Sequence, residues 1–253
     1  VFDVYEEHYA TYGAYDYEDM MLRASEIAQQ RTAEDLLDYR HVLVDEFQDL
    51  NRVQIDLLQA ILDQSPDVHL FAVGDDWQSI YRFRGARPEL FVEFENRFSP
   101  ATTTQLAINY RCPPAVVQAS SALMAESNLE SDKSLEAAPS NPETTPTVHV
   151  LAGKDDWQYE TNVKTWVTKR VKQSLAEDDR SPGEIMVLAR NEEGSPFVPR
   201  ITKELKKHDI VVNDGWDSVT VTTAHSAKGG EADHVILVNA VGDRSEDRAE
   251  CRP

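Results

Sequence analysis

Residues 41–49 of the chain read His-Val-Leu-Val-Asp-Glu-Phe-Gln-Asp. The short apolar run His41–Val44 predicts a buried strand, because a strand covered on both faces carries apolar side chains at successive positions. Asp45 and Glu46 follow at once, at the carboxyl edge where parallel sheets bind their ligands. One carboxylate can hold a cation such as Mg²⁺, and the next can take a proton from an attacking water. A bare Asp-Glu pair more often only ends a strand and caps the next helix, so the stretch needs support from elsewhere.

The same pattern returns at Val68–Val73, a second apolar run that predicts a buried strand. A polar loop follows it, starting at Gly74 and containing Gln78. The neutral amide of Gln78 can donate and accept hydrogen bonds at the same time, which suits contact with a terminal phosphate and its attacking water.

Aromatic and basic side chains alternate just downstream, at Tyr81, Arg82, Phe83 and Arg84. Such alternation places rings that can stack on bases beside cations that can bind phosphates. The alternative is a short helix that buries the aromatic rings. This alternative competes strongly for Tyr81 and Phe83, and less so for Gln78.

A third stretch, Asn109–Pro114, places Arg111 before a Pro-Pro pair. Held by this rigid segment, the guanidinium can reach an anionic ligand across a cleft, as an arginine finger does. A salt-bridged arginine on the surface is the alternative, and it would be favoured if the stretch stood alone.

A fourth stretch, residues 219–233, continues a predicted strand into His225, Lys228 and two glycines. Glycines let backbone amides approach a phosphate closely, and such amides form anion-binding loops. A polar turn between two buried strands is the alternative.

Strands alternate with helices along the whole chain, which predicts an α/β fold with mostly parallel sheets. Besides the two strands above, strands are predicted at Thr102–Leu106, Thr147–Leu151, Glu184–Ala189, Ile210–Val212, Ser218–Thr223 and His234–Val238. Helices are predicted at Val1–Tyr12, Tyr17–Gln30, Val53–Leu62, Pro88–Phe98, Pro114–Ala125, Trp157–Leu175 and Pro199–His208. The polar, proline-containing stretch 128–146 predicts a surface linker or loop.

Composition excludes several classes of protein. The 253 residues are 41% hydrophobic and 28% charged, enough for one large or two small domains with a buried core. No apolar run approaches the roughly 18 residues that cross a bilayer, and no signal peptide is visible. The cysteines, Cys112 and Cys251, are too few for a disulfide framework. We therefore expect a cytoplasmic protein without a membrane partner.

The net charge of -20 comes from 45 acidic and 25 basic residues. Taken alone, it argues against a nucleic-acid partner, because nucleic acids attract basic faces. The acidic residues are spread along the whole chain, however. A diffuse acidic surface is also what a salt-rich cytoplasm favours, since salt screens the self-repulsion. The charge therefore has a second interpretation, which is halophilic adaptation.

In their order along the chain and in their residues, the four stretches resemble the motifs of the UvrD/Rep family of superfamily 1 DNA helicases. Val44–Asp49 resembles motif II, the Walker B element, and Gly74–Ala86 resembles motif III. Asn109–Arg111 and Thr220–Glu231 resemble motifs IV and V. Residues 15–21 are similar to the acidic-aromatic helix that the family places before motif II.

Two further stretches, 70–78 and 232–236, are most similar to the helicase IV branch of the family. The resemblance implies a RecA-like P-loop NTPase architecture, in which helices flank parallel sheets. Residues 1–106 would be the C-terminal part of the first RecA-like domain. Residues 107–253 would be the N-terminal part of the second, with a flexible stretch near 128–146.

The resemblance also implies roles for matching residues. Asp45 would hold Mg²⁺, Glu46 would be the general base, and Gln78 would couple the γ-phosphate to the DNA. Three more residues would contact ATP: Tyr110 at the adenine, Arg111 at the γ-phosphate and Glu231 at the ribose. Contacts to single-stranded DNA are implied for Tyr81, Phe83, Arg84, Thr223, His225 and Lys228.

The implied activity is that of an ATP-dependent DNA helicase in DNA repair. It would use ATP and Mg²⁺ to move 3′-to-5′ on single-stranded DNA and to open duplex junctions. No protein partner is predicted. The phosphate-binding pattern Gly-x-x-x-x-Gly-Lys-[Ser/Thr] does not occur in this sequence. We therefore expect an internal piece of a helicase, covering motifs II to V, that hydrolyses no ATP by itself.

Two alternatives stay open at this stage. One is a non-catalytic DNA-binding or regulatory remnant that lacks the P-loop. The other is an unrelated P-loop ATPase with a Walker B strand, against which the surroundings of Gln78 and Arg111 argue.

The halophilic interpretation predicts that the chain becomes more stable as the salt concentration rises into the molar range. Screening relieves the repulsion of a net charge of -20. We expect the melting temperature to rise by several degrees between low and molar KCl, since about 1 kcal/mol shifts it by roughly 2–4 °C in a chain of this size. A melting temperature that stays flat or falls would contradict the interpretation.

Overall fold

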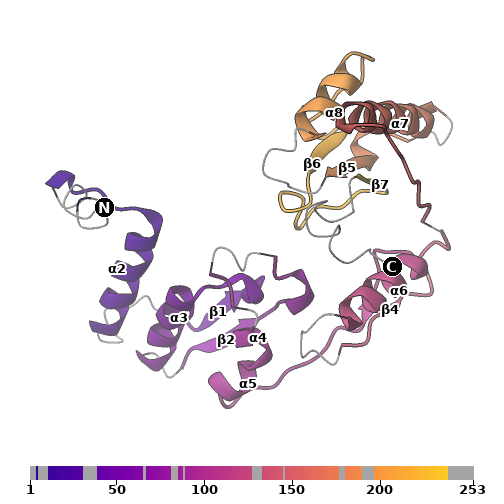
Figure 1. Ribbon diagram of the computed structural model, residues 1–253. Helices are drawn as coiled ribbons and strands as arrows, with labels where there is room; N and C mark the ends of the chain where they lie inside the picture. Colours follow the sequence, from indigo (N-terminus) through magenta and orange to yellow (C-terminus); the bar gives the residue numbers. More distant parts are fainter. Residues whose placement is uncertain are drawn as a thin grey trace, which may run out of the picture. The chain divides into compact units, whose positions relative to one another are not determined.

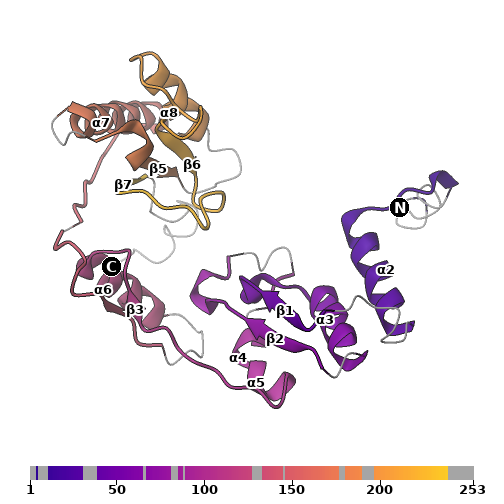
Figure 2. The same cartoon turned by 180° about the vertical axis from the view of Figure 1, so that it is seen from behind.

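The computed structural model describes residues 4, 11–30, 39–64, 67–80, 85–87, 89–126, 133–144, 146–176, 180–189 and 197–238. The chain forms two compact units, Val1–Pro146 and Thr147–Pro253 (Figures 1 and 2). The division of the helicase domains at residue 106 stays a prediction. Most of the helix expected over Val1–Tyr12 lies outside the described residues.

The first unit contains a pair of parallel strands, β1 (His41–Val44) and β2 (His69–Ala72), with His41 opposite His69. Helix α3 (Arg52–Gln64) lies between them in the chain, as a parallel connection requires. Helix α2 (Tyr17–Gln30) contacts α3. The predictions of both strands and of both helices are confirmed, with α3 slightly longer than expected.

Only one face of these strands is covered. Val42, Val44, Leu70 and Ala72 pack against a cluster of buried Phe47, Ile55 and Leu58. On the other face, Leu43 is 74% exposed and Phe71 is 61% exposed. The prediction of strands buried on both faces is therefore wrong for this part of the structure, because no described element covers the second face.

Two short helices, α4 (Glu89–Val92) and α5 (Phe94–Arg97), replace the single helix expected over Pro88–Phe98. Their side chains surround the ring of Phe47. The ring centroid of Phe47 lies 6.1 Å from Phe91, 5.3 Å from Phe94 and 6.0 Å from Phe98. The Phe94 and Phe98 contacts are edge-to-face, a geometry that aromatic pairs favour.

The rest of the first unit is built on a second, very short parallel pair, β3 (Ile108–Asn109) and β4 (Glu136–Ala137). Helix α6 (Pro114–Ala125) lies between them in the chain, within the predicted bounds. Its first position is proline, which has no amide hydrogen to leave unsatisfied there. The strand expected at Thr102–Leu106 does not form, because this segment pairs with no strand among the described residues.

The second unit is a three-stranded parallel sheet packed with two helices. Its strands are β5 (Ile185–Ala189), β6 (Thr220–Thr223) and β7 (His234–Val238), in the order β6-β5-β7. Its helices are α7 (Asp156–Ala176) and α8 (Phe197–Lys206), whose positions agree with the prediction to within a few residues.

Two of the strands expected in the second unit do not form as predicted. Thr147–Leu151 pairs with no described strand, and its Val148 and Val150 are exposed. Ile210–Val212 contributes only an isolated bridge between Val212 and Val219. β-Branched residues favour strands only where a partner completes the ladder, so the sequence pattern alone overestimates strand content here.

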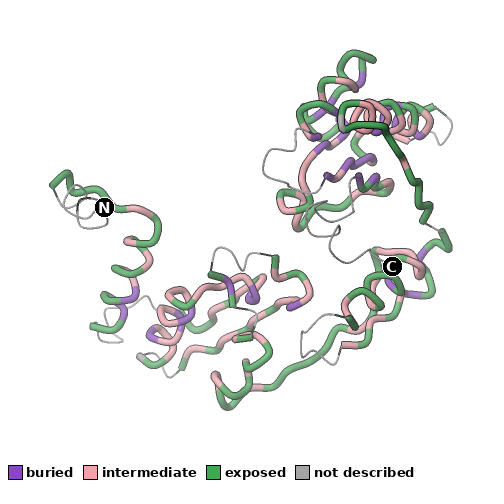
Figure 3. Tube along the Cα trace, viewed as in Figure 1, coloured by how far each residue is buried: buried purple, intermediate pink, exposed green. Residues whose placement is uncertain are grey.

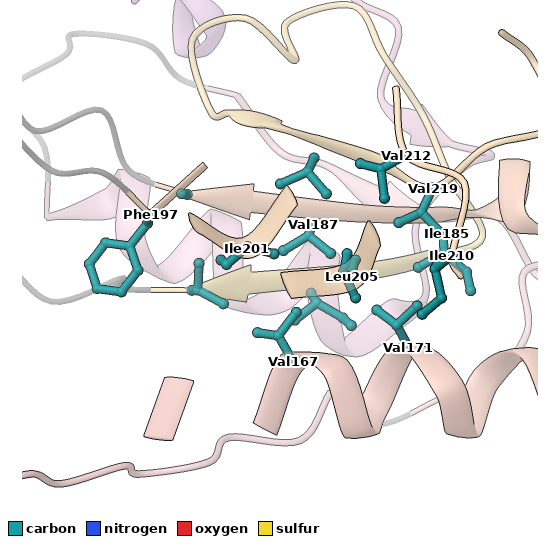
Figure 4. Close-up of a cluster of buried hydrophobic side chains, with 14 of the residues drawn as sticks. Val167, Val171, Ile185, Val187, Phe197, Ile201, Leu205, Ile210, Val212 and Val219 are labelled. Atoms are coloured by element: carbon teal, nitrogen blue, oxygen red, sulfur yellow. The ribbon is translucent and has the colours of Figure 1, made fainter. Parts of the chain in front are cut away.

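The core of the second unit joins both helices to all three strands (Figure 4). Val163, Val167 and Val171 recur every four residues, which puts them on one face of α7. Ile201 and Leu205 do the same on α8. Figure 3 shows that buried residues are concentrated in this unit.

The mixed α/β class with small parallel sheets is confirmed, whereas the RecA-like architecture stays a prediction. Among the described residues, no helix is both long enough and apolar enough to cross a membrane.

Burial predicts which leucines stabilise the second unit. Leu205→Ala removes a side chain with 0% exposure, and we expect it to lower the free energy of unfolding by about 3 kcal/mol. Leu237→Ala removes a leucine that is 57% exposed, and we expect a loss of about 0.5 kcal/mol or less. Urea denaturation followed by circular dichroism measures both variants. Equal losses would contradict the assigned core.

Candidate active site

Two loops lie side by side at the carboxyl edge of the first parallel pair. Asp45 and Glu46 directly follow β1, and Gly74–Gln78 follow β2. The backbone joins the loops, because the amide of Val73 donates to the carbonyl of Val44 (2.8 Å) and the amide of Phe47 donates to the carbonyl of Val73 (2.9 Å). The first and second stretches of the sequence analysis therefore meet at one edge.

Glu46 has a left-handed backbone, with φ 51° and ψ 43°. This conformation is uncommon for any residue but glycine, and it persists only where the surroundings hold it. Here the next residue, Phe47, is buried and begins a short 3₁₀ helix. The Oδ1 atom of Asp45 accepts a hydrogen bond from the amide of Glu46 (2.9 Å).

A chain of hydrogen bonds links Glu46 to Gln78. The side-chain amide of Gln48 donates to Oε2 of Glu46 (2.6 Å), and its Oε1 accepts from the amide of Asp75 (2.9 Å). Oδ2 of Asp75 then accepts from Nε2 of Gln78 (2.7 Å). Gln48 and Asp75 were not among the predicted site residues, although both lie inside the motif-like stretches.

Lys133 compensates the acidic charge of the second loop. Its Nζ lies 2.5 Å from Oδ1 of Asp75 and also forms an ion pair with Asp76, which is only 2% exposed. A buried carboxylate needs such a partner. The same Nζ lies 5.5 Å from the ring centroid of Trp77, within reach of a cation–π contact.

Burial by itself would raise the pKa of Asp75, but the hydrogen bonds from Lys133 and Gln78 outweigh it and lower the pKa below its ordinary value. Asp75 is therefore ionised at neutral pH. Because the folded state has the lower pKa, ionised Asp75 stabilises it, and this contribution is lost only as the pH falls through the acidic range.

The turn after β3 presents Tyr110 and Arg111 to solvent. Oδ1 of Asn109 accepts from the amides of Arg111 (2.9 Å) and Cys112 (2.8 Å). From the other side, Nδ2 of the buried Asn141 donates to the carbonyls of Asn109 (2.7 Å) and Cys112 (2.8 Å). These bonds fix the turn, while Tyr110 remains 73% exposed.

Lys133 and Asn141 both come from the stretch 128–146, which the composition marked as a linker or loop. Its described part, 133–144, contains β4 and the buried residues Ala138 and Asn141. The contacts of this segment thus reach both the Gly74–Gln78 loop and the Tyr110–Arg111 turn.

The fourth stretch forms the loop after β6 in the second unit. The amide of Ser226 donates to Oγ1 of Thr223 (3.2 Å), and Gly229 has a left-handed backbone with φ 79°. A shallow cavity of about 340 Å³ opens beside this loop, lined among others by Met186, Asn213 and Lys228. A polar depression with a lysine at its side can receive an anionic group.

The structure brings only some of the predicted residues together. Asp45, Glu46 and Gln78 share one edge of the first unit, and Tyr110 and Arg111 lie on another turn of that unit. The loop of the second unit carries Thr223, His225, Lys228 and Glu231. Tyr81, Phe83 and Arg84 lie outside the described residues.

Asp45 is the predicted magnesium ligand, and its carboxylate is exposed beside Glu46. Among the described residues, no group of three or more histidine, cysteine, aspartate or glutamate side chains could hold a metal ion. Mg²⁺ is commonly held by one or two carboxylates together with phosphate oxygens and water, so a single exposed carboxylate fits this ion.

The hydrogen bonds of Asn141 predict that this residue stabilises the Tyr110–Arg111 turn. Asn141→Ala leaves two carbonyls without their donor, and we expect the free energy of unfolding to fall by about 2 kcal/mol. Asn162→Ala is the control, because Asn162 donates one exposed bond to the carbonyl of Ala152 and its loss should cost about 0.5 kcal/mol or less. Chemical denaturation of both variants measures the difference, and similar losses would show that Asn141 does not hold the turn.

Parts of the chain are similar in sequence to known proteins. Residues 1–99 match the family model described as UvrD/REP helicase N-terminal domain. DNA helicase II of Escherichia coli is 32% identical over 171 residues, which are 66% of this chain and 23% of that protein. DNA helicase IV of the same species is 45% identical over 73 residues, or 29% of this chain and 11% of that protein.

A protein of Bacillus subtilis named as a candidate ATP-dependent DNA helicase, YjcD, is 31% identical over 199 residues, which are 77% of this chain and 25% of that protein. The chain thus spans about a quarter or less of the length of these curated relatives. Its first 99 residues match the UvrD/REP helicase N-terminal domain, and its homologues include DNA helicases of the UvrD type.

Proposed function

We propose that this chain is part of an ATP-dependent DNA helicase and that the edge of β1 and β2 is where ATP is hydrolysed. The observation that carries the proposal is the hydrogen-bonded chain from Glu46 through Gln48 and Asp75 to Gln78, beside Asp45. It joins a candidate base to a candidate phosphate contact across two strands. The names of the relatives support the same activity.

In this mechanism Asp45 would hold Mg²⁺, and the bound ion would neutralise charge on the phosphates. The carboxylate of Glu46, oriented by Gln48, takes the proton of the attacking water. Gln78 is the last residue in this series of hydrogen bonds, and its side chain is exposed. Its amide can therefore bond both to the γ-phosphate and to that water.

Three residues elsewhere complete the proposed nucleotide contacts. Tyr110 stacks on the adenine and Arg111 contacts the γ-phosphate, for which the fixed turn after β3 supplies a rigid support. Glu231, in the loop that follows β6, binds the ribose. The helicase domains divide at residue 106, as the motif order implies.

The partner in this proposal is DNA, as single strands and at duplex junctions, with 3′-to-5′ movement, a role in repair and a cytoplasmic location. The contacts to single-stranded DNA are assigned to Tyr81, Phe83, Arg84, Thr223, His225 and Lys228. Arg84 and Lys228 supply positive charge, which an acidic protein needs at a phosphate backbone. The helicase IV branch is the proposed position within the family.

A non-catalytic DNA-binding or regulatory protein is the weaker candidate. Such a protein does not need a base tied to a phosphate contact. The hydrogen bonds that join Glu46 to Gln78 support the catalytic alternative, and so do the names of the relatives, which are ATP-dependent enzymes or DNA helicases.

The proposal predicts the effect of two substitutions in the full-length protein. Glu46→Gln keeps the shape but cannot take a proton, so the kcat for ATP hydrolysis should fall by about 10²-fold or more, while the Kd for ATP changes little. Asp45→Ala should instead weaken binding of Mg²⁺-ATP. Phosphate release with single-stranded DNA measures kcat, and a fluorescent nucleotide measures Kd.

Glu26→Gln is the control, because Glu26 forms only an exposed pair with Arg23 and should leave both quantities unchanged. Near-normal turnover of Glu46→Gln would show that Glu46 is not the base.

A further inference from the structure

Gln48 is a buried amide whose two polar atoms are both used. The side chain has 0% exposure. Its Nε2 donates to the Glu46 carboxylate and its Oε1 accepts from the Asp75 amide, while its own carbonyl accepts from the Ser79 hydroxyl (3.4 Å). A residue that only filled space would not need this arrangement, because an apolar side chain of the same size would avoid the cost of burying an amide.

We infer that Gln48 is a positioning residue that orients the Glu46 carboxylate and couples it to the Gly74–Gln78 loop. The inference rests on the proposed function, in which Glu46 is the base. A glutamine suits this place because one planar group must offer a donor to a carboxylate and an acceptor to a backbone amide. Glutamate lacks the donor and methionine lacks both.

The coupling runs in both directions through the same bonds. Asp75 donates its amide to Gln48 and accepts the side chain of Gln78. A movement of Gln78 on a phosphate therefore reaches Glu46 through three hydrogen bonds. Because Glu46 lies in a left-handed conformation that its neighbours must hold, small changes at Gln48 displace the base.

Gly74 provides an independent sign of this contact. A Cβ atom at Gly74 would lie 2.6 Å from Oε1 of Gln48 and 3.0 Å from a ring carbon of Phe91. The backbone of Gly74 does not have the positive φ that would itself demand glycine. A side chain at position 74 would therefore collide first with Gln48, and it would also crowd Phe91 and the Phe47 amide.

The first test is Gln48→Glu in the full-length protein. The substitution keeps the shape but brings a second carboxylate to the position of an atom 2.6 Å from Glu46, which opposes ionisation of the base. We expect kcat at neutral pH to fall about tenfold, KM for ATP to stay within about twofold, and the acid limb of the pH–rate profile to move up by about one pH unit.

Gln59→Glu is the matched control. Gln59 also donates to a carboxylate, that of Asp63 (2.8 Å), but on the exposed surface of α3. The same chemical change there should leave the pH–rate profile unmoved.

The second test combines Gly74→Ala with Gln48→Ala. Gly74→Ala pushes Gln48 out of place, so alone it should lower kcat about as much as Gln48→Ala does. If the contact with Gln48 carries the effect, Gly74→Ala costs clearly less in the Gln48→Ala background than alone, because the new methyl group then meets only Phe91 and the Phe47 amide. Additive losses would mean that the two residues act separately and would overturn the inference.

The third measurement does not depend on activity. Hydrogen exchange of nucleotide-free full-length protein should show faster exchange, by about tenfold, at the Asp75 amide in Gln48→Met than in wild type. Two results together would overturn the coupling, even if Glu46→Gln abolishes hydrolysis. They are an unmoved pH–rate profile in folded Gln48→Glu and an unchanged exchange rate of the Asp75 amide in Gln48→Met. Full hydrolysis by Glu46→Gln would overturn the proposed function instead, and hydrogen exchange would then decide the coupling alone.

Discussion

The polar edge of the first unit depends on the burial of one apolar ring. Phe47 is 1% exposed, and its ring packs among Phe91, Phe94 and Phe98. Its amide donates to the carbonyl of Val73, so the same residue joins the core to the second loop. Glu46 precedes it and Gln48 follows it. An anchored phenylalanine thus determines where the carboxylate and the amide on either side of it can lie.

Ion pairs and charged hydrogen bonds also stabilise this edge, in addition to apolar packing. The chain has a net charge of -20, and in this loop two acidic residues, Asp75 and Asp76, are adjacent. Asp76 is buried. Lys133 offsets both charges from a segment far away in the sequence. The lowered pKa of Asp75 follows from this lysine and from Gln78 despite the opposing effect of burial. Asp75 therefore stays ionised at neutral pH and can keep accepting the hydrogen bond from Gln78.

The sequence predicted the elements whose pattern is local. Tyr17–Gln30 and Pro114–Ala125 are helices over the predicted residues, and His41–Val44 is a strand. Thr102–Leu106 and Thr147–Leu151 are rich in β-branched residues but pair with no strand in the described part of the chain. A strand depends on a second segment, and a single-sequence pattern does not identify that segment.

The candidate site was predictable to the same extent. Asp45, Glu46 and Gln78 stand out because each follows an apolar run, and strand order then brings them to one edge. No comparable sequence pattern singles out Gln48, Lys133 or Asn141. Their roles arise from contacts with residues that are distant in the sequence or on the far side of a turn. Composition even pointed away from Lys133 and Asn141, because a polar stretch with prolines is typical of linkers.

The two units differ in which described residues support their sheets. In the second unit, β5 has a partner on each side and a core that reaches from both helices. In the first, two strands rely on one covered face, and a pair of strands alone is barely stable in water. The candidate base, in its left-handed conformation, thus sits on the less buried of the two sheets. Within the described residues, the aromatic cluster around Phe47 is therefore the apolar packing that supports the covered face of this edge and the backbone next to Glu46.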